Sequence, residues 1–553
     1  RGEIARRVFA TCRRLGIETV AVHSDADARL PFVAEADHAV RLPGNTPAET
    51  YLRADLVIEA ARKSGADAIH PGYGFLSENA DFARAVAAAG LVWVGPDPDS
   101  IDSMGSKIES KKLMAAAGVP VLADLGTTAE EADLPLLVKA SAGGGGRGMR
   151  VVRALADLPA EVEKASAEAA SAFGDGTVFV EPYVEHGRHV EVQVVGDRHG
   201  TVAVFGERDC SIQRRHQKVV EEAPAPGLSA ETRAALHEAA RAAAAAISYV
   251  GAGTVEFLVD AADPTRFWFL EMNTRLQVEH PVTEAIFGVD LVEAQLAVAE
   301  GHPVSAYLAG DGPGEPRGHA VEVRLYAEDP AADWQPQSGL LSSFEIPGVA
   351  AEFANPAAFG LRLDTGFESG SEVGTHYDAM LAKVIAWAPT REQALRRLSA
   401  ALAQARVHGL TTNRDLLVEV LRHPVFVAGD VSTDFFHTQV LASRGVAGDV
   451  PQPVAAEVRQ AGLAAALALA ETDRAARTVQ RGLPVAWRNV LSAPQVTTFA
   501  LDRVEEPLEV AWFGGRDGYR ADEAAVLAAA PDRVTLEVDG VATTYRVLVD
   551  AGA

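Results

Sequence analysis

Polar side chains recur at every second position over nine residues, from Glu271 to Glu279, and this pattern constrains the fold more than any other feature of the chain. In an extended segment, Glu271, Asn273, Arg275, Gln277 and Glu279 would share one face of a strand. The alternative is a solvated strand face. Such faces usually carry Lys and Thr rather than this set of carboxylates, amides and a guanidinium, so the pattern favours a cleft-lining or buried face.

A second carboxylate, Glu256, lies fifteen residues upstream of Glu271 in a strand-like, β-branched run. The intervening residues 260–266 have the composition of a turn. A hairpin symmetric about that turn places Glu256 directly opposite Glu271. Two adjacent carboxylates repel unless a cation lies between them, and oxygen ligands with an Asn nearby suit Mg²⁺. We therefore predict a metal site at Glu256, Glu271 and Asn273.

A glycine-rich loop, residues 140–149, follows a short apolar run that predicts a buried strand ending at Lys139. Glycines let backbone N–H groups approach phosphate oxygens closely, and Lys139 can reach the same phosphates. The loop is not a Walker A motif, because no Gly-Lys-Ser/Thr follows the glycines. A flexible linker is the alternative. The adjacent Lys139 and the downstream carboxylate pair favour nucleotide binding.

Lysine is scarce in this chain. The 50 basic residues include eight lysines and therefore 42 arginines. The lysines are at positions 63, 107, 111, 112, 139, 164, 218 and 383. Lys107, Lys139 and Lys218 lie in motif-like surroundings, and a compact ammonium group on a flexible stem suits a phosphate that moves during a reaction.

Residues 207–222 are dense in charge, yet apolar β-rich runs flank them. Opposite charges at this density usually form a buried or cleft-lining ion network, although a solvated surface strand is possible. Cys210 lies in this segment, and we expect a buried, unreactive thiol.

Composition excludes several classes of protein. A chain of 553 residues is too long for one core and predicts three or four domains. The formal net charge of −26 argues against nucleic-acid binding. Only two cysteines, Cys12 and Cys210, are present, which excludes a disulfide framework and fits a reducing compartment. No run of residues is long and apolar enough to predict a membrane span.

Four segments together resemble biotin carboxylase, within the ATP-grasp superfamily: residues 70–79, the glycine loop after Lys139, residues 207–222 and residues 271–281. They occur in the family's order and at family-like distances, and the resemblance covers about residues 1–440. Residues 1–5 also resemble the end of the family's first strand and the turn after it.

The resemblance implies an α/β fold with three domains. A Rossmann-like N-terminal domain is expected at 1–105, an ATP-grasp domain at 106–315 with a mobile lid at about 127–185, and a C-terminal α+β domain at 316–440. The alternation of helix-like and strand-like runs in 1–105 independently predicts βαβ units with a parallel sheet. We reject a dinucleotide site there, because no Gly-x-Gly-x-x-Gly opens the unit.

The C-terminal residues follow another pattern. Residues 441–475 are Ala-rich and predict a helical connector. Residues 533–549 alternate around Asp539-Gly540, a strong hairpin signal, so we predict an antiparallel β-barrel at 476–553. The Trp-Arg-Asn at 487–489 resembles the opening of the BT domain, which joins the subunits of propionyl-CoA and methylcrotonyl-CoA carboxylases. The biotin-carrying Ala-Met-Lys-Met motif is absent, and we expect the carrier domain to follow the chain as given.

The resemblance assigns site residues by position. Those for ATP are Lys107, Lys139, Gly144, Gly145, Glu181, Val184, His189, Gln213 and His216. Those for bicarbonate are Lys218, Arg275, Gln277 and Val278. Two Mg²⁺ or Mn²⁺ ions are expected at Glu256, Glu271 and Asn273. The catalytic residues are Lys218, Arg275, Glu279 and Arg324, with Glu279 as the general base and Arg324 stabilising the biotin enolate. Family members usually carry a basic residue where this chain has Pro182.

The implied activity is the ATP- and bicarbonate-dependent carboxylation of biotin on a carrier domain through carboxyphosphate. This is the first half-reaction of a biotin-dependent acyl-CoA carboxylase. The implied partner is a carboxyltransferase (beta) subunit, bound through the BT domain in a hetero-oligomer. The expected location is the cytoplasm, or the mitochondrial matrix if a targeting peptide has been removed.

Two alternatives differ in activity. One is another ATP-grasp ligase, which the residues from Arg275 to Glu279 and from Gln213 to Lys218 argue against; biotin-dependent ATPase activity would decide. The other is a non-catalytic assembly subunit, which the full set of site residues argues against. The sequence leaves open which acyl-CoA is carboxylated and how many subunits assemble.

Overall fold

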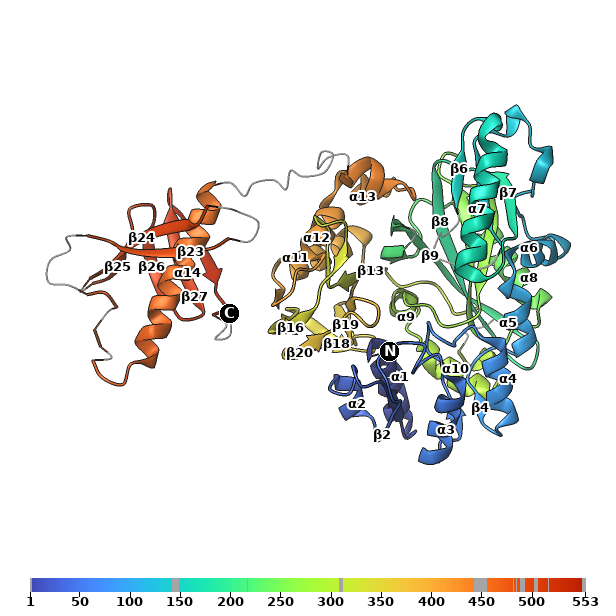
Figure 1. Ribbon diagram of the computed structural model, residues 1–553, viewed down its shortest axis with the longest axis horizontal. Helices are drawn as coiled ribbons and strands as arrows, with labels where there is room; N and C mark the ends of the chain where they lie inside the picture. The colour runs from blue at the N-terminus through green and yellow to red at the C-terminus, as the bar shows by residue number, and fades with distance from the viewer. Residues whose placement is uncertain are drawn as a thin grey trace. The chain divides into compact units, whose positions relative to one another are not determined.

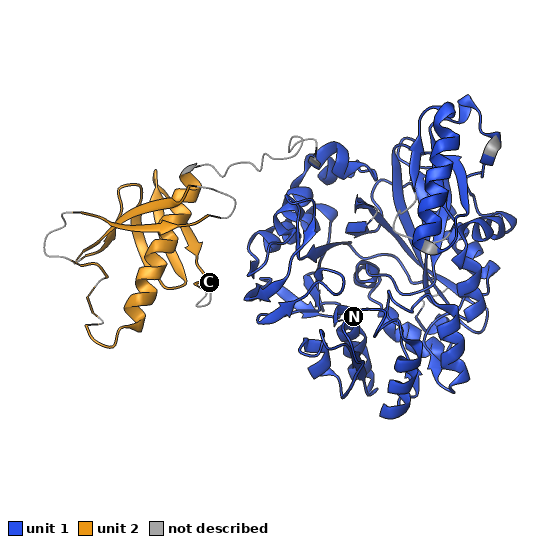
Figure 2. Ribbon diagram, viewed as in Figure 1, with its two compact units in different colours: residues 1–443 blue, residues 444–553 orange. Residues whose placement is uncertain are grey.

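The computed structural model describes residues 2–141, 149–215, 217–307, 312–441, 455–480, 482–483, 485–487, 493–501, 506–515 and 517–549. Three residues predicted to bind ATP, Gly144, Gly145 and His216, lie outside the described residues. The chain divides into two compact units, residues 1–443 and 444–553 (Figure 2).

The first hundred residues form small parallel strand pairs with helices. β1 (Val20–His23) pairs with β2 (His38–Arg41), and β3 (Ala68–Ile69) pairs with β4 (Val92–Trp93), both in parallel, which confirms the predicted parallel pairing. The helices are α1 (Gly2–Leu15), α2 (Pro31–Glu35), α3 (Ala54–Ser64), α4 (Ala80–Ala88) and α5 (Pro98–Gly105).

The predicted strand end and turn at residues 1–5 is wrong, because α1 begins at Gly2. The sequence supplies a reason. Ile4, Val8 and Cys12 are spaced four residues apart, so a helix gathers them on one face, where they are buried.

A three-stranded antiparallel sheet, β6-β5-β7, lies in the region predicted to be the lid. Its strands are β5 (Leu136–Ala140), β6 (Arg150–Val152) and β7 (Val178–Pro182), and α7 (Leu158–Phe173) packs on them (Figure 1). The helix α6 (Lys107–Ala116) precedes this sheet in the chain. The buried strand predicted before Lys139 is therefore present as β5.

The main element of the first unit is a nine-stranded sheet with the order β12-β11-β8-β9-β10-β13-β21-β19-β18. The strands are β8 (Gly187–Gly196), β9 (Val202–Arg214), β10 (Gln217–Ala223), β11 (Gly251–Asp260), β12 (Phe267–Asn273), β13 (His319–Tyr326), β18 (Val349–Glu352), β19 (Leu361–Thr365) and β21 (Met380–Ala388). Only the β18–β19 pair at one edge is parallel. Because β10 pairs with β13, the sheet continues through the predicted boundary at 315/316.

Helices and short strands complete this unit. The helices are α8 (Ala230–Ala246), α9 (His280–Phe287), α10 (Leu291–Ala299), α11 (Arg391–Ala403), α12 (Arg414–Arg422) and α13 (Pro424–Ala428). The two-stranded pairs are β14 (Glu328–Asp329) with β15 (Gln335–Pro336), β16 (Gly339–Leu341) with β20 (Ser371–Val373), and β17 (Ser343–Glu345) with β22 (Arg406–His408). Short helical turns are η1 (Gly126–Thr128), η2 (Glu131–Asp133), η3 (Leu155–Asp157), η4 (Val304–Tyr307) and η5 (Phe436–Leu441).

The β11–β12 hairpin confirms the predicted register, since Glu256 faces Glu271 directly. The prediction that the strand continues to Glu279 is wrong, because β12 ends at Asn273. Glu279 instead takes the N-cap position of α9, with Pro281 in the first turn. Proline favours the first turn of a helix, so the alternating pattern gives way to a loop and a helix.

Within its described residues, the second unit contains one helix and two three-stranded antiparallel sheets. The helix is α14 (Ala455–Ala476). One sheet contains β23 (Gln495–Phe499), β24 (Leu508–Gly515) and β25 (Gly518–Arg520), and the other contains β26 (Ala525–Ala530), β27 (Arg533–Val538) and β28 (Val541–Arg546). Asp539 and Gly540 form the predicted two-residue turn, with φ angles of 51° and 78°.

Two predictions for this region need correction. The Ala-rich helix is present, but it is not a connector: Leu463 and Leu467 of α14 pack with Trp512, Val534 and Leu536 of the sheets in one buried cluster. The strands within the described residues form two separate sheets rather than a closed barrel. Strand alternation predicts hairpins, but closure depends on strand tilt and stagger, which alternation does not encode. Every helix in the described part of the chain is too short or too polar to cross a bilayer.

Candidate active site

The carboxylate of Glu256 lies at the centre of a buried polar cluster. Lys218 Nζ is 2.8 Å from Glu256 Oε1, and His189 Nε2 is 2.8 Å from Glu256 Oε2. The amides of Asn273 and Gln277 donate to Glu256 Oε1 at 2.8 and 3.2 Å. Burial alone would raise the pKa of Glu256, but Lys218 and His189 outweigh it and lower that pKa. Glu256 is therefore ionised.

Glu271, directly opposite on β12, has a different environment. Burial, and then the negative charge of Glu256, raise the pKa of Glu271, while Lys107 acts in the opposite direction. A cation bound between the two facing carboxylates would offset their repulsion. Carboxylate oxygens with an amide oxygen nearby are ligands that Mg²⁺ accepts, so Glu256, Glu271 and Asn273 fit the predicted metal.

Lys218 bridges three carboxylates. Its Nζ lies 2.5 Å from Glu191, 2.8 Å from Glu256 and 2.7 Å from Glu279. Burial would lower the pKa of Lys218, but the three carboxylates raise it well above the usual value. The amine is therefore a fixed positive charge at the junction of β8, β10, β11 and the start of α9.

Glu279 is fully buried, and two cations contact its carboxylate. Lys218 donates to one oxygen, and Arg324 donates to the other at 3.0 Å. Burial would raise the pKa of Glu279, but Lys218, Arg324 and Arg208 hold it well below the usual range. Arg324 is itself oriented by Glu221, which accepts its Nε–H at 2.6 Å. The result is an ionised carboxylate between two oriented cations.

The guanidinium of Arg275 is held on three sides. Its Nε donates to Glu78 at 2.9 Å, one terminal nitrogen donates to Gln277 Oε1 at 2.8 Å, and the other donates to Asn273 Oδ1 at 2.9 Å. Fixed in this way, Arg275 is suited to bind a planar oxyanion.

A second cluster lies on the three-stranded sheet. The carboxylate of Glu181 forms ion pairs with the Nζ atoms of Lys111 at 2.6 Å and Lys139 at 2.5 Å. The backbone N–H of Lys107, the first residue of α6, donates to Ser141 O at 3.2 Å. The structure thus brings the predicted phosphate-binding lysines to the described ends of the glycine loop. Val184 lies half-buried between β7 and β8.

His189 connects the predicted adenosine and metal residues. Its Nδ1 lies 2.9 Å from Gln213 Nε2, and its Nε2 faces Glu256. Burial lowers the pKa of His189, but Glu256 outweighs burial and raises it. Gln213 also donates to the carbonyl of Cys210. Cys210 is buried, and burial raises its pKa well above the usual value, as expected for an unreactive thiol.

Comparison with known proteins identifies the family. Three sequence profiles match: the N-terminal domain of biotin carboxylase over residues 1–101, the ATP-binding domain of the carbamoyl-phosphate synthase L chain over 98–307, and the biotin carboxylase C-terminal domain over 322–438. Biotin carboxylase 2 of Bacillus subtilis is 46% identical over 445 residues, which cover 79% of this chain and 97% of that protein. The chain belongs to the biotin carboxylase family.

Longer relatives also match. The mitochondrial methylcrotonoyl-CoA carboxylase subunit alpha of Mus musculus is 45% identical over 456 residues, 80% of this chain. The match covers 62% of the mouse protein, so the chain matches less than two thirds of that relative's length.

Solved structures extend the comparison. A biotin carboxylase from Campylobacter jejuni matches with a TM-score of 0.73 and 39% identity over 79% of this chain and 97% of that one. Rhizobium etli pyruvate carboxylase matches with a TM-score of 0.76 and 36% identity, over 92% of this chain and 44% of that one. The match to pyruvate carboxylase covers 92% of this chain, which is more than the 443 of 553 residues in the first unit. It therefore extends past residue 443 into the second unit.

Within this biotin carboxylase unit, sequence reasoning missed several charged residues of the site. They are Glu78, Lys111 and Glu191, which contact predicted residues. Arg208 and Glu221 lie in the segment 207–222, where a buried or cleft-lining ion network was predicted, but no individual role was predicted for either residue. One signal was available for Glu191: His189, Glu191 and Gln193 place polar side chains at every second position of an otherwise apolar strand.

Proposed function

We propose that this chain catalyses the ATP- and bicarbonate-dependent carboxylation of biotin held on a carrier domain, the first half-reaction of an acyl-CoA carboxylase. The observation that best supports this proposal is the buried Glu279 carboxylate. Lys218 and Arg324 contact it, beside the facing pair Glu256 and Glu271. This cluster combines a base, positive charge for anions and hard oxygen ligands.

Glu279 is the proposed general base. Because its pKa lies well below the usual range, it is ionised at neutral pH and can accept the proton of bicarbonate. The oxygen so freed attacks the γ-phosphorus of ATP, and the bond to ADP breaks, giving carboxyphosphate. Lys218 and Arg275 bind the negative charge that accompanies this step, with Gln277 and Val278 completing the bicarbonate site.

The phosphates of ATP are assigned to Lys107, Lys139 and the glycine loop. Two Mg²⁺ or Mn²⁺ ions would be held by Glu256, Glu271 and Asn273 and would supply Lewis-acid charge stabilisation to the phosphoryl group. The adenosine is assigned to Glu181, Val184, Gln213 and His216, together with His189, although Glu256 also faces His189. These assignments carry the family's positions over to this chain.

Arg324 is assigned to biotin. Carboxyphosphate breaks down to CO₂ and phosphate, the ureido N–H of biotin loses its proton to that phosphate, and the nitrogen attacks CO₂. The guanidinium of Arg324, oriented by Glu221, stabilises the enolate form of the ureido group.

The test measures ADP release and the incorporation of labelled bicarbonate into free biotin by the full chain. Both should require ATP, bicarbonate and Mg²⁺. Glu279→Gln should strongly suppress both, whereas Glu392→Gln, a matched change at an exposed carboxylate on α11, should leave both unchanged. ADP release that responds to ammonia or an amino acid, and not to biotin, would favour another ATP-grasp ligase.

The second unit is proposed as the BT module that binds a carboxyltransferase subunit. Supporting this, it has its own apolar core, and the likeness to a multidomain biotin-dependent carboxylase extends past residue 443. The carboxyltransferase subunit would determine which acyl-CoA is carboxylated. Methylcrotonoyl-CoA is the first substrate to test, because the mouse relative is named for it. Acetyl-, propionyl- and long-chain acyl-CoA serve as comparisons.

A further inference from the structure

The base Glu279 follows a buried segment with no regular structure. Residues 274–279 connect β12 to α9 without a helix or strand of their own. Buried backbone groups outside a ladder need other partners. The carbonyl of the half-buried Val278, which belongs to the peptide unit that leads into Glu279, has such a partner. It accepts a hydrogen bond from Lys383 Nζ at 2.8 Å.

Lys383 is fully buried on β21, where it pairs in register with Arg324 of β13. Its Nζ also lies 2.8 Å from Glu3 Oε1 and 3.7 Å from Asp364 Oδ2. Burial would lower the pKa of Lys383, but these carboxylates, together with Glu322, raise it. A buried charge is costly unless it is paired, so this amine is held in place by its partners and directed at one backbone carbonyl.

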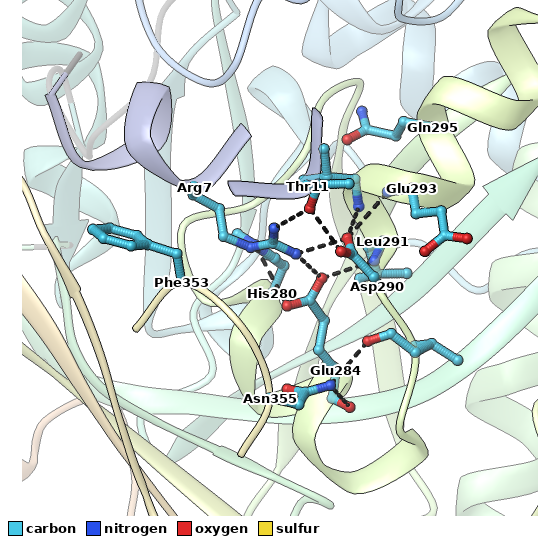
Figure 3. Close-up of polar contacts among 12 residues, drawn as sticks. Arg7, Thr11, His280, Glu284, Asp290, Leu291, Glu293, Gln295, Phe353 and Asn355 are labelled. Atoms are coloured by element: carbon cyan, nitrogen blue, oxygen red, sulfur yellow. Dashed lines mark hydrogen bonds and ion pairs between the residues drawn. The ribbon is translucent and has the colours of Figure 1, made fainter. Parts of the chain in front are cut away.

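The helix that follows Glu279 is held by further ion pairs at Glu284, in its second half. The carboxylate of Glu284, in α9, forms ion pairs with Arg7 at 2.6 Å and with Arg362 at 2.7 Å. Figure 3 shows Arg7 between Glu284 and Asp290, with the His280 ring beside them. Ion pairs therefore fix the body of α9, whereas Lys383 fixes the peptide from which the Glu279 side chain emerges.

We propose that Lys383 is a positioning residue for the carboxylation reaction, which holds the Val278–Glu279 peptide so that the Glu279 carboxylate meets Lys218 and Arg324. This inference rests on the proposed function, in which Glu279 is the base. Lys383 needs no contact with substrate for this role. Its contribution is geometric, and misplacing a reacting group by about 1 Å can cost on the order of 100-fold in rate.

The test is Lys383→Met in the full chain, which keeps an unbranched side chain as far as Cε and removes the ammonium group. We expect kcat for bicarbonate-dependent ADP release to fall by about 100-fold, with the KM for ATP unchanged. The acid limb of the pH–rate profile should also move to higher pH, because a displaced Glu279 loses the cations that hold its pKa down.

Glu3→Gln is the matched control. It weakens the same buried ion pair but leaves the Lys383–Val278 hydrogen bond, so the pH profile should stay where it is in the wild type. The double variant Glu3→Gln/Lys383→Met removes both charges. If the single lysine variant fails to fold, kcat and the pH–rate profile are measured on this double variant instead.

The possible outcomes are distinct. The lower kcat and the shifted acid limb in the lysine variants alone support the role of Lys383. An unshifted limb in both lysine variants, or an equal shift in Glu3→Gln, would overturn it. An inactive wild-type chain would refute the proposed function instead.

Discussion

The two units of this chain both have apolar cores, but they differ in the charged groups that they bury. The interior of the first unit contains many ionised groups: Arg208 contacts Glu191, and Arg362 contacts Glu284 and Asp364, all with almost no exposure. The core of the second unit is apolar, with Leu and Ala of α14 against Val, Leu and Trp of the two sheets.

Buried ion pairs are poor evidence for stability, because desolvation offsets much of their attraction. Their concentration in one unit therefore indicates a role in binding and chemistry. The second unit buries apolar area, which stabilises a fold without specifying a reaction. From this contrast we infer that activity should depend on single polar side chains in the first unit, and that the second unit should affect only assembly.

The largest effect is expected for Glu279→Gln. Both bicarbonate-dependent ADP release and biotin carboxylation should fall on the order of 10²–10⁴-fold, because the general base is lost. Steady-state assays with free biotin measure both. Near-normal ADP release in this variant would show that Glu279 is not the base.

Arg324→Ala should separate the two activities. Biotin carboxylation should fall on the order of 10²–10³-fold, because the enolate loses its stabilising cation. ADP release should fall less than carboxylation, because Arg324 is assigned to biotin. Some loss of ADP release is still expected, because Arg324 also contacts the base Glu279. The ratio of the two rates in one assay is the measurement. Equal losses would contradict the assignment.

Glu256→Gln and Glu271→Gln should each raise the Mg²⁺ concentration needed for half-maximal activity by roughly 10–100-fold. Losing even a residue that only contacts a metal ligand typically weakens metal affinity by about this factor. Mg²⁺ titrations at saturating ATP provide the measurement. The reason is the facing register of the two carboxylates. An unchanged Mg²⁺ requirement in both variants would exclude this pair as the metal site.

The smallest effect should come from deleting residues 444–553. Carboxylation of free biotin should stay close to that of the full chain, because every residue assigned to that reaction lies at or before Arg324. The shorter deletion of 476–553 should instead produce aggregation, since it leaves Leu463 and Leu467 of α14 without their partner strands. Size-exclusion chromatography separates these outcomes. With a carboxyltransferase subunit present, co-elution of the 444–553 deletion would exclude the docking role.

Local patterns predicted local structure well. The turn at residues 260–266 gave the correct hairpin register, and Asp539-Gly540 gave the correct two-residue turn. The errors concern tertiary context. An Ala-rich helix has the same sequence pattern as a connector or as a core element, and only the partner strands decide between them. The end of β12 at Asn273 depends on a helix that begins seven residues later, at His280.

The site could be predicted only in part. Glu256 and Glu271 were inferred from spacing, and Lys218, Glu279 and Arg324 from resemblance, and the structure brings these five together. The residues that orient them were not found. Glu221 contacts Arg324 across a separation of 103 residues, and Lys383 contacts the carbonyl of Val278 across 105 residues. No local pattern encodes such contacts.

The continuous nine-stranded sheet has a consequence for how the first unit folds. The strands from β8 to β12 pair mainly with near neighbours in sequence, but β10 must wait for β13, about a hundred residues later. Until then, both strands present unpaired edges, which are prone to non-native association. Residues 1–443 should therefore unfold and refold as one cooperative body, with no stable intermediate that contains the ATP-grasp region alone.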